Sequence, residues 1–101
     1  MVERKNVADL RDFDGALYLD SKEAIAAYLT DVLDVQDDAM LASALGDIAR
    51  LRGLTEIAKS AGMSRETLVQ ELRPDSMLRF DTFNRVCAAL GVRLIVQPIQ
   101  D

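Results

Sequence analysis

The sequence predicts an all-α domain of five helices that ends in a short C-terminal β-strand, and three observations lead to this prediction. Half of the 101 residues are hydrophobic but only 5% are aromatic, an aliphatic composition that suits helices. Apolar residues recur at three- and four-residue spacing along most of the chain, as on one face of a helix. Near the C-terminus this period gives way to the alternating apolar pattern of a strand.

The chain divides into three segments of one domain, because its length allows a single modest core. Residues 1–19 alternate acidic side chains with isolated apolar ones and lack a helical period, so we expect an extended or flexible N-terminal arm. Residues 20–91 are predicted to form the helical domain, and residues 92–101 the C-terminal strand.

Two long helices follow the arm. Asp20 with Glu23 gives the capping-box pattern of a helix start. Cations in a last turn followed by Gly end helices, and Arg50, Arg52 and Gly53 are expected to end the second helix. An acidic stretch over residues 34–38 separates the two apolar faces, which are Ile25, Tyr28, Leu29, Val32 and Leu33, then Met40, Leu41, Ala44, Leu45, Ile48 and Ala49.

The segment LTEIAKSAGMSRETLVQEL, residues 54–72, has the spacing of a helix-turn-helix. Ala58 is small where two helices must cross closely, and Gly62 suits a turn with positive φ. Ser64 is a good N-cap for the second helix, and Leu68 points back between the pair.

The remaining caps complete the helical domain. Thr55 is expected to cap the first short helix, and Pro74 breaks the second. Asp81 is expected to cap a fifth helix that Gly91 ends. Its inward face contains Cys87, which we interpret as a small core residue rather than a reactive thiol.

The C-terminal strand has no obvious partner. Pro98 cannot donate a ladder hydrogen bond, so pairing should stop there. A lone strand cannot satisfy its own backbone, and its partner is the same strand of a second subunit, residues 16–19 of the arm, or another protein. We predict a homodimer formed through Val92, Leu94, Ile95 and Val96.

Composition argues against an enzyme. The chain has no His and a single Cys, which leaves no Cys–His pair and too few ligands for zinc, so no metal or other cofactor is expected. No apolar run is long enough to span a membrane and no signal peptide is visible. A single Cys also suits a reducing compartment, and we expect a cytoplasmic protein without membrane contact.

The charge distribution allows DNA binding. The net charge is −5, but residues 1–53 contain six basic and eleven acidic residues, whereas residues 54–101 contain six of each. Arg65, Glu66, Thr67 and Gln70 could reach the major groove if their helix is exposed, with Arg suited to guanine and Gln to adenine. An ordinary solvated helix face is the alternative. Supporting contacts to DNA are expected from Ser64, Thr55, Lys59, Arg73 and Arg79.

Three blocks carry a family resemblance: YLDSKEAIAAYL (18–29), ALGDIARLRGLTEIAKSAGMSRETLVQEL (44–72) and FDTFNRVCAALGVRL (80–94). They resemble the HigA-like antidote (antitoxin) family of bacterial type II toxin–antitoxin modules, within the lambda-repressor-like helix-turn-helix superfamily. Two features depart from the family pattern. Glu71 stands where members usually carry a small apolar residue, and residues 74–77 replace a Gly-Asn-Pro turn.

The resemblance implies a dimeric antitoxin that binds palindromic operator DNA, represses its own operon and neutralises a small basic RelE/HigB-like ribonuclease toxin. Phe13, Tyr18 and Leu19 are the candidates for contacting that toxin, because acidic and apolar residues suit a basic partner. Two alternatives remain open: a stand-alone helix-turn-helix transcriptional repressor without a toxin, and a protein–protein adaptor that has lost DNA binding.

Overall fold

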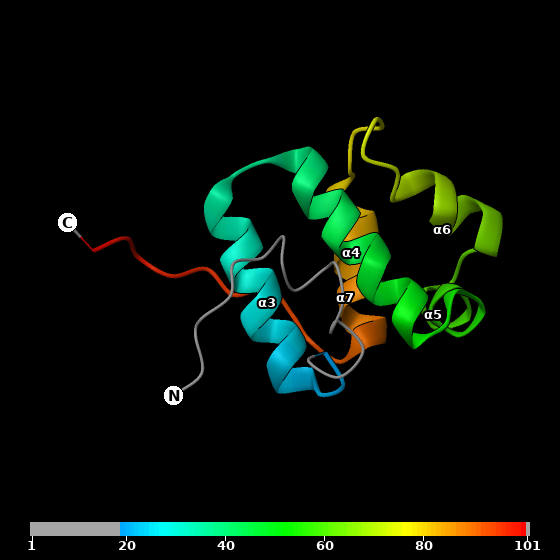
Figure 1. The fold of residues 1–101 in the computed structure, drawn as a ribbon, viewed down its shortest axis with the longest axis horizontal. Coiled ribbons are helices and arrows are strands. Elements are labelled where there is room, and N and C mark those ends of the chain that lie inside the picture. Colours follow the sequence, from blue (N-terminus) through cyan, green and yellow to red (C-terminus); the bar gives the residue numbers. More distant parts are fainter. Residues whose placement is uncertain (1–18, 101) are drawn as a thin grey trace.

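A computed structural model describes residues 19–100. The helices in this range are α3 (Lys22–Val35), α4 (Asp38–Arg52), α5 (Leu54–Ala61), α6 (Arg65–Glu71) and α7 (Phe80–Leu90). The prediction of five helices is therefore confirmed. Figure 1 shows α3 at one side of the molecule and α6 at the other, with α4 and α7 between them.

The start of α3 corrects the predicted cap by one residue. Ser21, not Asp20, is the N-cap, and its Oγ accepts a hydrogen bond from the backbone N–H of Ala24 at 3.1 Å. A hydroxyl at this position satisfies one of the free amides of the first turn, so the adjacent carboxylate is not needed. Asp37 does the same for α4, where its Oδ1 accepts from the N–H of Met40 at 3.1 Å.

The predicted caps Thr55 and Asp81 are wrong. Gly53 alone joins α4 to α5, since its N–H donates to Ala49 at 2.9 Å and its carbonyl accepts from Ile57 at 3.0 Å. This one-residue corner leaves Thr55 inside the first turn of α5. Asp81 likewise lies in the first turn of α7, where a carboxylate favours the positive end of the helix dipole without capping it.

The predicted glycine stops are confirmed. Gly53, Gly62 and Gly91 have φ values of 106°, 75° and 88°, a region that residues with a Cβ rarely adopt. Gly62 and Gly91 each follow a helix directly. The second helix of the pair ends at Glu71, three residues before Pro74.

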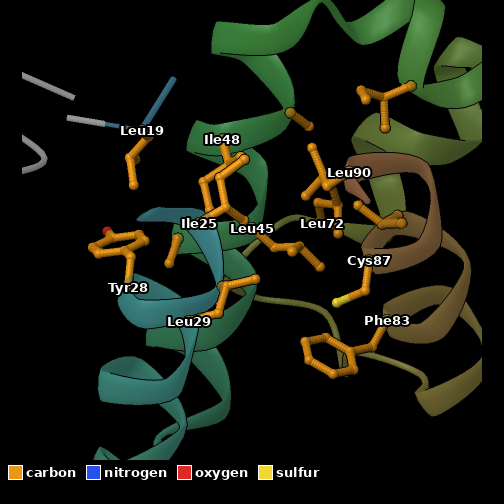
Figure 2. Packing of buried hydrophobic residues seen from close by; sticks show 14 of the residues in the cluster. Leu19, Ile25, Tyr28, Leu29, Leu45, Ile48, Leu72, Phe83, Cys87 and Leu90 are labelled. Atoms are coloured by element: carbon orange, nitrogen blue, oxygen red, sulfur yellow. The ribbon is translucent and has the colours of Figure 1, made fainter. Parts of the chain in front are cut away.

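The core lies between α3 and α4 on one side and α7 on the other (Figure 2). α3 packs on α4, while α5 packs on α4, α6 and α7. Ile25, Leu45 and Ile48 are fully buried, and each such aliphatic side chain contributes roughly 1.5–3 kcal/mol on transfer from water. The two predicted apolar faces supply eight of the seventeen buried residues in the core cluster, and Leu33, Met40 and Leu41 pack at its edge.

The predicted strand over residues 92–97 is not formed in the structure. Residues 92–100 contain no regular secondary structure and run past α3 as an extended tail (Figure 1). A strand exists only when a neighbouring strand completes its hydrogen bonds, and none of residues 19–100 pairs with this tail. Within residues 19–100, no helix has both the length and the apolar character needed to cross a membrane.

Candidate nucleic-acid interface

α5 and α6 are two short helices joined by the turn at residues 62–64. In the turn, the N–H of Gly62 donates to Lys59 at 3.2 Å and the N–H of Met63 donates to Ala58 at 3.0 Å. Ala58 and Leu68 are both buried, as their sequence positions predict. The pair is therefore held from inside by small and aliphatic residues, which fixes the direction in which α6 leaves the turn.

The start of α6 is fixed by two hydroxyl groups. Ser64 Oγ accepts a hydrogen bond from the backbone N–H of Thr67 at 3.0 Å, so its predicted role as the N-cap is confirmed. The Ser64 hydroxyl also donates to Thr67 Oγ1 at 2.9 Å. Thr67 thus keeps its own O–H available for a partner outside the protein.

The outer side of α6 is polar and solvent-exposed. Arg65, Glu66, Thr67 and Gln70 are all exposed, whereas Leu68 is buried. At 3.6 residues per turn, Glu66 and Gln70 lie opposite Leu68, and Arg65 and Thr67 lie on the two flanks. The predicted exposure of this helix face is therefore present in the structure.

The residues expected to support this face lie on α5 and on the connector between α6 and α7. Thr55 and Lys59 are exposed and stand one turn apart on α5. Arg79 is exposed just before α7. Arg73 is exposed as well, but its guanidinium is already paired with Asp75, with contacts of 3.2 Å and 3.0 Å to the two carboxylate oxygens.

Ser76, which sequence reasoning missed, ties the connector to α6. Its hydroxyl lies 3.2 Å from the carbonyl oxygens of both Gln70 and Arg73, and its N–H donates to Arg73 at 3.1 Å. These bonds occupy carbonyl groups that a helix end leaves free. They hold the first half of the connector beside the last turn of α6, although the Gly-Asn-Pro turn is absent.

A second missed contact joins α6 to α7. Thr82, which is 4% exposed, donates a hydrogen bond from its hydroxyl to Glu71 Oε1. Glu71 stands three residues after the buried Leu68, on the side of α6 that faces the body. A charged residue at such a position needs a buried partner, and that requirement is the sequence signal that could have located the contact.

Thiol reactivity and metal binding are the other kinds of chemistry to consider among the described residues. Burial raises the pKa of the Cys87 thiol to about 11 through desolvation, which makes it a poor nucleophile at neutral pH. The interpretation of Cys87 as a core residue is thereby confirmed. Among residues 19–100, no cluster of three or more His, Cys, Asp or Glu side chains is placed to hold a metal ion.

Three residues were expected to contact a toxin, and four were expected to contact a second subunit. Phe13 and Tyr18 lie outside the described residues. Leu19 is 5% exposed and belongs to the core, so in this conformation its side chain is not available to a partner, contrary to expectation. The four predicted dimerisation residues all lie on the tail, Val92 partly buried and the other three, Leu94, Ile95 and Val96, exposed.

The described residues form a small all-α domain in which a short helix with an exposed polar face follows a tight turn. The chain belongs to the family described as "probable addiction module antidote protein", whose model matches residues 9–98. It is 42% identical over 88 residues to an uncharacterized protein of Haemophilus influenzae, a match that covers 87% of this chain and 91% of that protein. No solved structure matches the chain.

Membership of this family confirms the antitoxin part of the resemblance at a general level. An antidote of an addiction module acts against a toxin, so the family implies a toxin partner. Antidote families are not normally families of enzymes.

Proposed function

We propose that this antidote protein binds operator DNA as a homodimer through the outer face of α6, represses its own operon, and neutralises a RelE/HigB-like ribonuclease toxin. The observation that carries the proposal is the family match over residues 9–98. The exposed polar face of α6 supports the DNA-binding part, because a helix enters the major groove only when its face stands clear of the protein body.

Base contacts are assigned to the two side chains with suitable hydrogen-bonding groups. Arg65, in the first turn of α6, suits the two acceptors of guanine, and Gln70 suits adenine. Thr67 contacts a thymine methyl group or a phosphate. Glu66 repels phosphates and accepts a hydrogen bond only from cytosine. It therefore disfavours other base sequences and does not raise the affinity for DNA in general.

Phosphate contacts are assigned to Lys59, Arg73 and Arg79, with the Thr55 hydroxyl and the backbone N–H groups beside Ser64 at the start of α6 as additional donors. The pair between Arg73 and Asp75 does not prevent this role. Its guanidinium and carboxylate are 57% and 68% exposed, and exposed pairs contribute only about 0–1 kcal/mol. A DNA phosphate can therefore compete for Arg73.

A dimer is assigned because one copy presents a single short reading helix and a small number of cations. Two copies related by a twofold axis read two half-sites about 34 Å apart, one turn of DNA, which doubles the contacts. The toxin is assigned to the N-terminal arm, where Phe13 and Tyr18 supply apolar anchors among acidic residues. A stand-alone repressor is disfavoured by the antidote family, which implies a toxin.

A gel-shift titration tests the DNA assignment, using a duplex from the region upstream of the protein's own gene. Arg65→Ala and Gln70→Ala should each weaken specific binding by about 1–3 kcal/mol, or about 5- to 150-fold. Lys22→Ala is the matched control, because it removes one exposed positive charge from α3, at the opposite side of Figure 1 from α6. Wild-type affinity in both α6 variants would exclude them from the DNA contact.

A separate experiment tests whether this protein binds and neutralises a toxin. The tagged protein is co-expressed with the product of the neighbouring gene, and the purified material is examined for a small basic protein. A stable complex that suppresses RNA cleavage by that protein is the expected result. A neighbouring product that does not bind this protein and does not cleave RNA would favour the stand-alone repressor. A wild-type chain that does not bind DNA would favour the adaptor.

A further inference from the structure

A tight turn after α6 places Arg73 next to Asp75. The backbone N–H of Ser76 donates to the carbonyl oxygen of Arg73 at 3.1 Å, which closes a β-turn over residues 73–76. Pro74 stands at the second position of this turn, where its fixed φ is favoured, and Asp75 stands at the third. Because this bond closes the turn, the backbone holds the side chains of Arg73 and Asp75 close together.

The contact between these two side chains is the one that arginine makes with a phosphate. Arg73 Nε donates to Asp75 Oδ1 at 3.2 Å, and Arg73 Nη2 donates to Asp75 Oδ2 at 3.0 Å. Arginine binds carboxylates and phosphates alike through two parallel hydrogen bonds of this kind. A carboxylate of the same chain therefore occupies the donors that a DNA phosphate would use.

The pair lies beside the last turn of α6. The backbone N–H of Arg73 donates to the carbonyl oxygen of Gln70 at 3.3 Å, and the hydroxyl of Ser76 lies 3.2 Å from the same oxygen. Gln70 is one of the two residues assigned to base contacts. An acidic side chain is therefore fixed next to the face through which the protein is proposed to bind a negatively charged polymer.

We propose that Asp75 competes with DNA for the guanidinium of Arg73 and thereby sets how tightly the α6 face holds the DNA backbone. This inference rests on the proposed DNA binding and adds a residue that acts against it. A phosphate that binds Arg73 must first break the bonds to Asp75. It then lies close to the released carboxylate, which repels it. Both effects lower the affinity for DNA.

The pair is exposed enough to open when DNA binds. The side chains of Arg73 and Asp75 are 57% and 68% exposed, and ion pairs at such sites are weak in water. A buried pair would instead hold Arg73 permanently, because breaking it leaves an uncompensated charge inside the protein. Asp75 therefore reduces the affinity by a limited factor and does not block the contact.

The expected effect on affinity has two parts. Release of an exposed ion pair changes an equilibrium constant by up to about fivefold. Repulsion between Asp75 and a phosphate about 8 Å away changes it by less than about twofold, since the Debye length is about 10 Å at 0.1 M salt. Most of the effect is therefore expected to depend on Arg73.

Fluorescence anisotropy at about 0.1 M salt, with a labelled duplex from the region upstream of the protein's own gene, tests the proposal. Asp75→Asn should tighten binding about three- to eightfold for each bound copy. Damage to the fold weakens binding and cannot produce this gain. Asp34→Asn is the matched control, because it makes the same change of charge on α3, opposite to α6 in Figure 1. It should change the affinity less than about twofold.

A second measurement tests the dependence on Arg73. In the Arg73→Ala background, Asp75→Asn should tighten binding less than about twofold, because only the repulsion is left to remove. An equal gain with and without Arg73 would overturn the competition.

The outcomes also separate this inference from the proposed function. If Arg65→Ala weakens binding but Asp75→Asn leaves it unchanged or weaker, the inference is overturned and the DNA contact of α6 stands. A wild type that does not bind the duplex would overturn the proposed DNA binding and this inference with it.

Discussion

The hydroxyl of Thr82 on α7 donates a hydrogen bond to the carboxylate of Glu71, the last residue of α6. Thr82 is buried, while Glu71 is half-buried. This contact connects the candidate reading helix to the core helix behind it. It also accounts for an acidic residue on the inner side of α6, where the family resemblance led us to expect a small apolar one.

Thr82→Val should destabilise the protein by about 1–3 kcal/mol, because it removes the donor and leaves a partly buried carboxylate without it. Urea unfolding followed by circular dichroism measures the free energy of unfolding. Thr30→Val is the matched control, since the Thr30 hydroxyl donates to the backbone carbonyl of Ala26 on the exposed side of α3. Equal effects of the two substitutions would show that the contact to Glu71 adds nothing.

Ser64→Ala should lower the free energy of unfolding by about 0.5–2 kcal/mol, because it removes the acceptor for the N–H of Thr67. The short α6 depends on this cap more than a long helix would. Ser60→Ala, in the exposed face of α5, should be neutral or slightly stabilising, since Ala is the better helix former. Thermal melts of both variants make the comparison, and a neutral Ser64→Ala would contradict the role of the cap.

Gly62→Ala should cost about 1 kcal/mol through its backbone alone. Its φ is 75°, and a Cβ at this position would meet nothing nearer than an Arg85 nitrogen at 4.0 Å, so crowding contributes little. Gly62→Asn should cost less, because Asn tolerates this conformation better than Ala does. Chemical denaturation of the two variants gives the order of stability, and the reverse order would reject the explanation from φ.

Protein stability should fall as the pH rises from 9 towards 11 because of Cys87. Burial raises the pKa of its thiol from 9.0 to about 11, so in this window the unfolded chain releases the proton and the folded chain keeps it. Fewer protons bound in the unfolded state means that stability decreases with pH, by an amount on the order of 2–3 kcal/mol. Cys87→Ala should flatten that part of the stability curve, and an unchanged slope would rule out this cause.

The sequence predicted the helices well because their signals are local. Apolar periodicity located the faces of α3 and α4, and Gly53, Gly62 and Gly91 located the helix ends, since positive φ is a property of single residues. The cap positions were less predictable. Ser21, not Asp20, is the N-cap of α3, and the one-residue corner at Gly53 places Thr55 inside α5.

The remaining differences depend on contacts distant in sequence. The alternating pattern of residues 92–97 indicates a strand, but no local signal tells whether a partner strand lies within the same chain. The bond between Thr82 and Glu71 joins residues from different helices, and only the three-dimensional structure brings them together. The exposed face of α6 was predictable because Ala58, Gly62, Ser64 and Leu68 together fix which side turns inward.

The corner at Gly53 limits how this protein can vary in length. Inserting one residue there would rotate α5 by about 100° about its axis and carry Ile57 and Ala58 out of the core. The connector over residues 73–79 is exposed along most of its length, and the hydrogen bonds of Ser76 hold only its first half beside α6. Insertions and deletions among natural relatives should therefore collect between α6 and α7, while the spacing from α4 through α6 stays fixed.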